Sequence, residues 1–238
     1  MSSRPADSLR DVDIQVDYLE HHPSSVLYRS GKTLVLCTAS LEPSVPPWME
    51  GKGKGWVTAE YNMLPGSTVP RKRRERSKVD GRTTEIQRLI GRSLRAILDL
   101  EALGERSIVV DCDVLQADGG TRTASITGGF VALARAVTQA VPGSEIGNGP
   151  LQDSIAAISV GVVNEEVRLD LDYELDYAAD VDMNVVMTGS GRFVEIQGTG
   201  EEATFDDAQL ASMLAFAKRG IGELTRKQLA ALSSPSVR

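Results

Sequence analysis

The sequence predicts an α+β fold in which helices pack on largely antiparallel sheets. Apolar residues alternate in three pairs of neighbouring segments separated by short turns, which is typical of β-hairpins. Three longer stretches carry apolar residues at helical spacing. Strands and helices are interspersed without strict βαβ alternation, so a doubly wound parallel sheet is not expected.

The expected strands follow from the alternation and the turn residues between them. The predicted hairpins pair residues 25–29 with 33–38, 155–163 with 167–175, and 184–187 with 193–197. Two further strands are expected at 55–64 and 108–114.

Three helices are expected between these strands. The first is preceded by Thr84 and Gln87, which have the spacing of a capping box. The second covers about residues 124–141 and ends at Pro142, and the third covers about 206–232 and is entered at Thr204.

Length and composition limit the possible classes of protein. The 238 residues are 41% hydrophobic and 25% charged, which is enough for a sizeable core. Neither a repeat nor a long linker divides residues 1–238, so a single domain is expected. No stretch approaches the roughly 20 consecutive apolar residues of a membrane span, and the start lacks an apolar signal core. Cys37 and Cys112 lie far apart, which excludes a disulfide framework. We therefore expect a soluble, cytoplasmic protein.

Charge is distributed very unevenly along the chain. Residues 71–82 hold seven basic and two acidic side chains, a net charge of +5. Because the whole chain has a net charge of −7, the remaining residues together carry −12. Residues 165–182 hold eight acidic side chains against Arg168. Such opposed regions suit a protein that binds phosphates in one place and a metal ion in another, although on charge alone a solvated basic loop and a solvated acidic sheet face are the favoured interpretation.

The segment 118–125, Asp-Gly-Gly-Thr-Arg-Thr-Ala-Ser, follows an expected strand and opens an expected helix. Free amides at a helix start favour anions, glycine allows close backbone approach, and the guanidinium of Arg122 matches phosphate oxygens. Arg82 also lies next to an expected helix start, so two arginines could hold one dianion. An ordinary capped turn explains the same segment, and the residues alone leave both interpretations open.

The acidic region has its own pattern. Apolar and acidic residues alternate over residues 169–176, which predicts a strand with one polar edge. Asp180, Asp182 and Asn184 share one side of the next expected strand. Where these two expected strands meet, two neighbouring carboxylates would repel each other unless a cation or a proton lay between them. Mg²⁺ is a cation that suits such a position. For Asp170, Asp172 and Glu174, a solvated edge is the simpler interpretation.

Several other chemistries are excluded. Gly31-Lys32-Thr33 ends like a P-loop, but Val26 occupies the position of the first glycine. The two histidines of the chain, His21 and His22, are adjacent, which excludes a dispersed Ser-His-Asp or Cys-His system. Aromatic residues make up 5% of the chain, so base stacking is not expected to dominate RNA recognition.

Six stretches in order along the chain resemble the ribonuclease PH family of phosphate-dependent 3′ exoribonucleases. They are 35–40 (VLCTAS), 55–65 (GWVTAEYNMLP), 81–92 (GRTTEIQRLIGR), 111–128 (DCDVLQADGGTRTASITG), 181–187 (VDMNVVM) and 195–199 (EIQGT). The run 111–128 is the most specific of them.

The resemblance implies a single domain of the ribosomal protein S5 domain 2-like type, with mixed, largely antiparallel sheets, assembled as a homohexamer from three dimers. It implies an enzyme that trims tRNA precursor 3′ ends, using inorganic phosphate as co-substrate and releasing nucleoside 5′-diphosphates. Phosphate binding is implied for Arg82, Gly120, Thr121 and Arg122. A catalytic role, as metal ligands for Mg²⁺ or as acid, is implied for Asp176 and Asp182.

Further expectations concern partners. The basic residues that we expect to contact the RNA backbone are Arg71, Lys72, Arg73, Arg74, Arg76 and Lys78. Neither DNA nor a membrane is expected as a partner. The chain departs from the family at its amino terminus, which lacks a Gly-Arg, and at Leu175, where relatives commonly carry an acid. Two rival functions are a non-catalytic, RNA-binding ring subunit of the exosome-like kind and a hydrolytic nuclease that uses metal-bound water.

Overall fold

Two β-sheets and five α-helices form the computed structural model, which describes residues 4–74, 79–200 and 203–234. The first sheet has the strand order β1-β2-β3-β5-β4, with β1 (Val12–Val16), β2 (Ser25–Ser30), β3 (Thr33–Glu42), β5 (Ser107–Gln116) and β4 (Trp56–Met63). The second has the order β7-β6-β8-β9, with β7 (Glu166–Leu169), β6 (Ile155–Val163), β8 (Val181–Thr188) and β9 (Phe193–Gly200). All neighbours are antiparallel except β4 and β5.

The helices are α1 (Gly81–Arg95), α2 (Leu100–Leu103), α3 (Thr121–Ala140), α4 (Tyr173–Tyr177) and α5 (Asp207–Ser233), with short 3₁₀ turns at Pro47–Met49 and Pro65–Ser67. The α+β class and the three hairpin connections are confirmed. Among the described residues, no helix combines the length and the apolar character that a lipid bilayer span requires.

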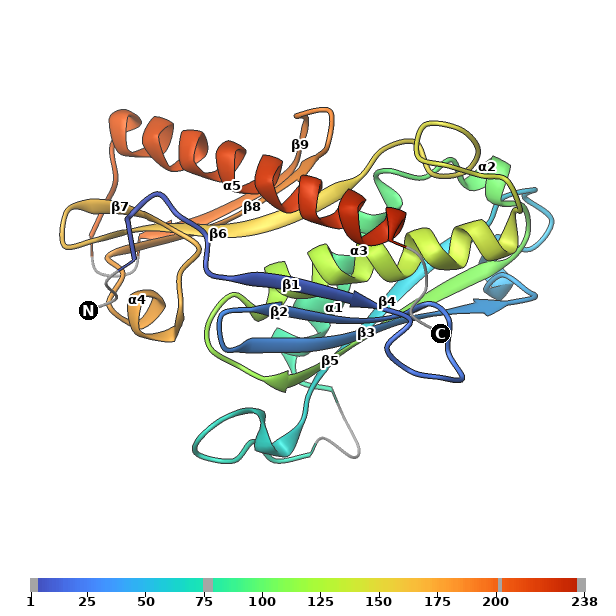
Figure 1. Ribbon diagram of the computed structural model, residues 1–238, viewed down its shortest axis with the longest axis horizontal. Coiled ribbons are helices and arrows are strands. Elements are labelled where there is room, and N and C mark those ends of the chain that lie inside the picture. The colour runs from blue at the N-terminus through green and yellow to red at the C-terminus, as the bar shows by residue number, and fades with distance from the viewer. Residues whose placement is uncertain (1–3, 75–78, 201–202, 235–238) are drawn as a thin grey trace.

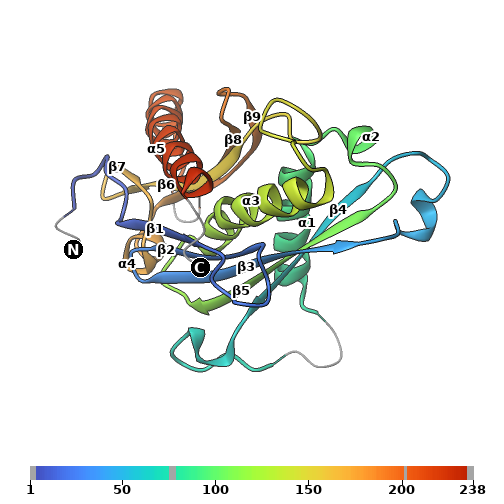
Figure 2. The same cartoon turned by 45° about the vertical axis from the view of Figure 1, so that its right-hand side comes forward.

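Helix α3 lies between the two sheets (Figures 1 and 2). It packs against β2, β3 and β5 of the first sheet and against β6 of the second, while α1 packs on β4 and α5 on β6 and β7. Because α3 has apolar or small residues on both faces, most of its side chains are buried, including Ile126, Phe130 and Leu133. One cluster of buried hydrophobic residues includes members of both sheets and of α1, α3 and α5.

The prediction of one long strand over residues 167–175 is wrong beyond Leu169, where β7 ends. Asp170 adopts a left-handed backbone conformation with φ of 56°, and Asp172 then caps α4 by accepting a hydrogen bond from the amide of Leu175 at 3.0 Å. Leu171 and Leu175 are both buried. Leu171 lies just before the cap and Leu175 lies inside α4, so both side chains are buried without a strand.

The interpretation of Asp170 and Asp172 as part of a solvated edge is also wrong. Asp170 is 2% exposed and holds a buried ion pair, and Asp172 is a helix cap. Glu174 is exposed, as that interpretation expects.

Two predicted helix entrances require correction. Helix α1 begins at Gly81 because Asp80 accepts the amide of Thr83 at 2.6 Å, so Thr84 lies inside the first turn and forms no capping box. Helix α5 is capped by Asp206 in a capping box with Gln209, not by Thr204. The second helix begins three residues earlier than predicted, at Thr121.

Candidate active site

The start of α3 forms the centre of the candidate site. Strand β5 leads into a loop in which Gly119 and Gly120 have φ values of 75° and 64°, a region that glycine adopts without steric cost. Gly120 is the N-cap of α3, provides no capping side chain, and is followed by a first turn without acidic residues. The amides at the start of a long helix, together with its dipole, make this position favourable for an anion.

Thr121 and Arg122 occupy the first turn of α3. The hydroxyl groups of Thr121 and Tyr61 lie 2.8 Å apart, and Tyr61 is buried on β4. Burial raises the pKa of Tyr61, while the hydrogen bond to Thr121 and the positive charges of Arg82 and Arg122 oppose that rise.

Arg122 is held between two elements from distant parts of the chain. Its Nη1 atom lies 3.5 Å from Oε2 of Glu85 on α1 and donates to Oε1 of Gln197 on β9 at 3.1 Å. Arg82 is exposed in the first turn of α1, three residues before Glu85. The two sequence-predicted arginines thus lie at neighbouring helix starts.

Asp182 is half-buried near the start of β8. On the next strand, Thr199 lies directly opposite Asp182, and Gln197 lies opposite Asn184. Because side chains two residues apart share one face of a sheet, Gln197 and Asp182 are diagonal neighbours on the same face. Since Gln197 bonds to Arg122, this face of the second sheet is the one turned towards the start of α3.

Asp176 is exposed on α4, and α4 begins against the glycine loop. A Cβ atom placed on Gly119 would lie 2.6 Å from the carbonyl oxygen of Leu171 and 2.6 Å from the carbonyl carbon of Asp172. The backbones of the loop and of the start of α4 are therefore in direct contact, at a separation that only glycine permits.

The acidic side chains can be tested against the chemistry of Mg²⁺. Within the described ranges, no three or more His, Cys, Asp and Glu side chains form a group that could hold a metal ion. Two carboxylates, Asp176 and Asp182, are nevertheless a donor set that suits Mg²⁺, which commonly keeps several waters and completes its shell with substrate phosphate oxygens.

The basic stretch lies in the connection before α1. Arg71, Arg73 and Arg74 are exposed, and Lys72 is half-buried with its Nζ atom 3.9 Å from Asp80. The remaining two candidates for RNA binding, Arg76 and Lys78, lie outside the described residues.

The structural roles of four residues in this region were not predicted from the sequence. Tyr61 and Gln197 hold Thr121 and Arg122, and a buried ion pair of Arg10 and Asp170 lies behind the glycine loop. Tyr61 and Gln197 do fall inside stretches that resemble the ribonuclease PH family. Nothing in the local sequence around Arg10 or Asp170 indicates their pairing across 160 residues.

Comparison with known proteins decides the family. Residues 8–139 match the model of domain 1 of the 3′ exoribonuclease family, and residues 153–220 match the model of domain 2. The chain belongs to the 3′ exoribonuclease family. Over 237 residues it is 73% identical to ribonuclease PH of Rhodopirellula baltica, covering 97% of this chain and 96% of that protein. Over 228 residues it is 57% identical to ribonuclease PH of Bacillus subtilis, covering 94% and 93%.

Solved structures with a similar fold include a chain from an exosome. Rice Rrp46 matches with a TM-score of 0.79 at 17% identity, covering 98% of this chain and 99% of that one. A chain of the Archaeoglobus fulgidus exosome with RNA bound to the active site matches with a TM-score of 0.79 at 20% identity, covering 94% and 90%. At these identities the likeness establishes the fold, and the sequence relatives establish the family.

Proposed function

We propose that this exoribonuclease shortens RNA from its 3′ end by phosphorolysis, with inorganic phosphate bound at the start of α3. One arrangement carries the proposal: two arginines at neighbouring helix starts, Arg82 and Arg122, adjoin the Gly120 helix start and the sheet face that bears Asp182. Each cycle transfers the terminal nucleotidyl group to phosphate and releases a nucleoside 5′-diphosphate. The name shared by the curated relatives supports this reaction.

The first task of such a site is to neutralise the nucleophile, because phosphate is an anion that must approach an anionic phosphodiester. Arg82 and Arg122 supply two guanidinium groups, and the amides and hydroxyl at Gly120 and Thr121 supply further donors. Charge-assisted hydrogen bonds of this kind hold and orient the nucleophile for in-line attack.

The second task falls to Asp176 and Asp182, which would hold Mg²⁺. When bound, Mg²⁺ offsets negative charge on the scissile phosphate and on the departing 3′ oxygen. Asp182 acts as a ligand, as the proton donor to that oxygen, or as both. Asp176 lies on the short helix whose start contacts the glycine loop, and this contact supports its assignment to the reaction centre.

The RNA substrate is held beyond the reaction centre by positive charge. The side chains of Arg71, Lys72, Arg73, Arg74, Arg76 and Lys78 contact the RNA backbone without reading bases. The preferred substrates are tRNA precursors, and the enzyme works in the cytoplasm as a ring of six built from three dimers. The family, the relatives' name and the exosome folds of its structural neighbours support these assignments.

One assay separates phosphorolysis from the two rival functions. The protein is incubated with a short, 3′-labelled RNA and Mg²⁺, with and without inorganic phosphate, and the released nucleotide is identified. Phosphorolysis yields nucleoside diphosphates and stops without phosphate. Monophosphates released at any phosphate concentration would establish a hydrolytic nuclease, and binding without release would establish a non-catalytic subunit.

Substitution of Gly119 by alanine tests whether the loop must contact α4. The new Cβ would lie 2.6 Å from two backbone atoms, and the φ of 75° disfavours alanine, so the loop must move away from α4. We expect phosphorolysis to fall by about a hundredfold, since small displacements of bound reactants have effects of that size.

The matched control for that variant is Gly222→Ala on α5, where a new Cβ meets nothing within 4 Å. It is expected to retain full activity. Full activity of Gly119→Ala, with its melting temperature unchanged, would show that the contact does not matter for the reaction.

A further inference from the structure

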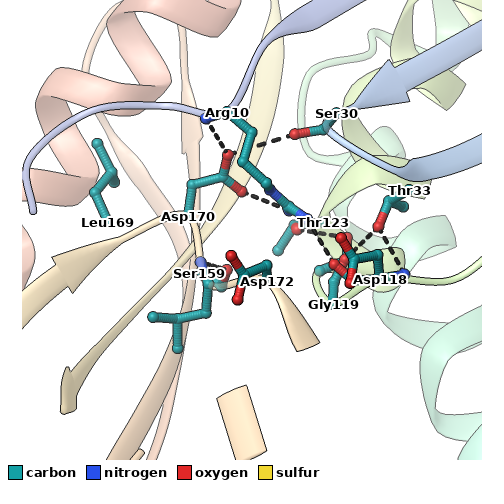
Figure 3. A network of polar contacts seen from close by, with 12 residues as sticks. Arg10, Ser30, Thr33, Asp118, Gly119, Thr123, Ser159, Leu169, Asp170 and Asp172 are labelled. Atoms are coloured by element: carbon teal, nitrogen blue, oxygen red, sulfur yellow. Dashed lines mark hydrogen bonds and ion pairs between the residues drawn. The ribbon is translucent and has the colours of Figure 1, made fainter. Parts of the chain in front are cut away.

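A buried ion pair joins the amino-terminal segment to both parts of the candidate site. The Nη2 atom of Arg10 donates to Oδ1 of Asp170 at 2.7 Å, and its Nη1 atom donates to the main-chain carbonyl of Asp118 at 2.6 Å (Figure 3). Oδ2 of Asp170 accepts the main-chain amide of Arg10 at 2.9 Å. The two side chains are 7% and 2% exposed. One guanidinium therefore connects the turn before α4 with the loop before α3.

The loop is anchored through its carbonyl groups. Asp118 offers its carbonyl to Arg10, Gly119 offers its carbonyl to the hydroxyl of Thr33 at 2.7 Å, and Gly120 offers its carbonyl to the first turn of α3 (Figure 3). In a trans peptide the carbonyl and the next amide point in opposite directions. The bond from Arg10 to the Asp118 carbonyl thus fixes the direction of the Gly119 amide. Because glycine itself tolerates many backbone conformations, this bond and the contact with α4 together set the orientation of the peptide.

The same pair fixes the start of α4. Asp170 has a φ of 56°, and its amide donates to the carbonyl of Ser159 at 2.7 Å. The amide of Leu171 then donates to the hydroxyl of Ser159 at 3.0 Å, which sets the path from β7 into α4. Leu171 also contacts Gly119, so the backbone path set at Asp170 leads directly into the contact between the loop and α4.

Stability alone does not explain the pair. Removing two charges from water is costly, and apolar residues of similar size often replace a buried ion pair without loss of stability. Apolar residues, however, have no N–H group that could donate a hydrogen bond to the Asp118 carbonyl, as Arg10 does. Arg10 also approaches the helix start closely, since a Cβ atom placed on Gly120 would lie 3.0 Å from its Nη2 atom.

We propose that Arg10, held by Asp170, is a positioning residue for inorganic phosphate: it orients the backbone of the loop at 118–120 and sets that loop against α4. The inference rests on the proposed phosphorolytic function and adds to it a buried residue that touches neither phosphate nor RNA. Its role is to present backbone donors, while the charges of Arg82 and Arg122 provide the attraction.

The test is the paired substitution Arg10→Met with Asp170→Asn, which removes both charges together and keeps a residue that tolerates positive φ. The matched control is Arg135→Met with Asp17→Asn. Arg135 lies near the other end of α3 and donates to Asp17 at 2.6 Å, and Asp17 also has a positive φ, of 53°.

We expect the first paired variant to raise the KM for phosphate about tenfold, equivalent to about 1.4 kcal/mol, while its melting temperature and its RNA affinity without phosphate match those of the control. A purely structural ion pair predicts a changed melting temperature and an unchanged phosphate KM. A phosphate KM within about twofold of the control would overturn the proposal, since such a difference is under 0.5 kcal/mol.

If the paired variant does not fold, Arg10→Lys decides the question. Lysine keeps the charge opposite Asp170 but lacks the planar fork that reaches two acceptors, so its phosphate KM must also rise, and an unchanged value contradicts the proposal. The unmodified protein distinguishes this inference from the proposed function. If the unmodified protein shortens RNA at a rate that does not depend on phosphate, the proposed phosphorolysis is wrong. If it requires phosphate and the Arg10 variants have the same KM for phosphate as the control, only the role of Arg10 is wrong.

Discussion

Replacement of Asp182 by asparagine is expected to abolish turnover while leaving the fold and the assembly intact. The side chains have nearly the same shape, and Asp182 is half-buried on β8, so packing is preserved. Asparagine carries no negative charge for a metal ion and is a poor proton donor. We expect kcat for phosphorolysis to fall by about 10²–10⁴-fold, the range for loss of a positioned acid or base.

Single-turnover phosphorolysis of a labelled RNA measures this effect, and gel filtration reports the assembly. The control is Asp13→Asn, which changes another half-buried aspartate, on β1 of the first sheet. If Asp182→Asn turned over RNA at a rate close to that of the control, Asp182 would have no part in the reaction.

Replacement of Arg122 by alanine is expected to raise the phosphate requirement sharply while RNA binding persists. Arg122 lies in the first turn of α3, and its side chain is 19% exposed between Glu85 and Gln197. Loss of a charge-assisted hydrogen bond costs about 1.5–3 kcal/mol, which corresponds to roughly a 10- to 150-fold increase in the KM for phosphate.

The measurement is the rate of nucleoside diphosphate release across a range of phosphate concentrations, together with RNA binding in its absence. Arg192→Ala is the control, because Arg192 is exposed in the turn between β8 and β9, at the opposite end of β8 from Asp182. Binding of phosphate by Arg122 at the start of α3 would be rejected if the phosphate dependence of Arg122→Ala equalled that of the control.

Local patterns predict much of the fold because they report local physics. The hairpin β2–β3 and the buried helix α3 follow from alternation, turn residues and helical periodicity. The alternation at residues 169–175 fails as a guide because Asp172 caps a short helix, so Leu171 is buried just before the cap and Leu175 is buried inside the helix. Asp80 likewise displaces the expected cap of α1, since both positions offer suitable oxygen acceptors.

The charged residues of the candidate site can be picked out from the sequence, whereas the residues that hold them in position cannot. Arg82 and Arg122 stand next to expected helix starts, and Asp182 falls on an expected strand, so the sequence indicates them as candidates, while their roles come from the family resemblance. The contacts of Arg122 to Glu85 and Gln197, and of Thr121 to Tyr61, join segments 37 to 75 residues apart in the chain. Such contacts depend on how the two sheets pack around α3, which periodicity does not encode.

The placement of α3 between the sheets has a consequence for the growing polypeptide. The helix and its glycine loop are complete once Ala140 has been made, but the strands that carry Asp182 and Gln197 come from the last third of the chain. A nascent protein that stops before β8 has the start of α3 and Asp176 but lacks Asp182 and Gln197. Ribosome-bound intermediates should therefore bind RNA without shortening it, and phosphorolysis should arise only when synthesis is nearly finished.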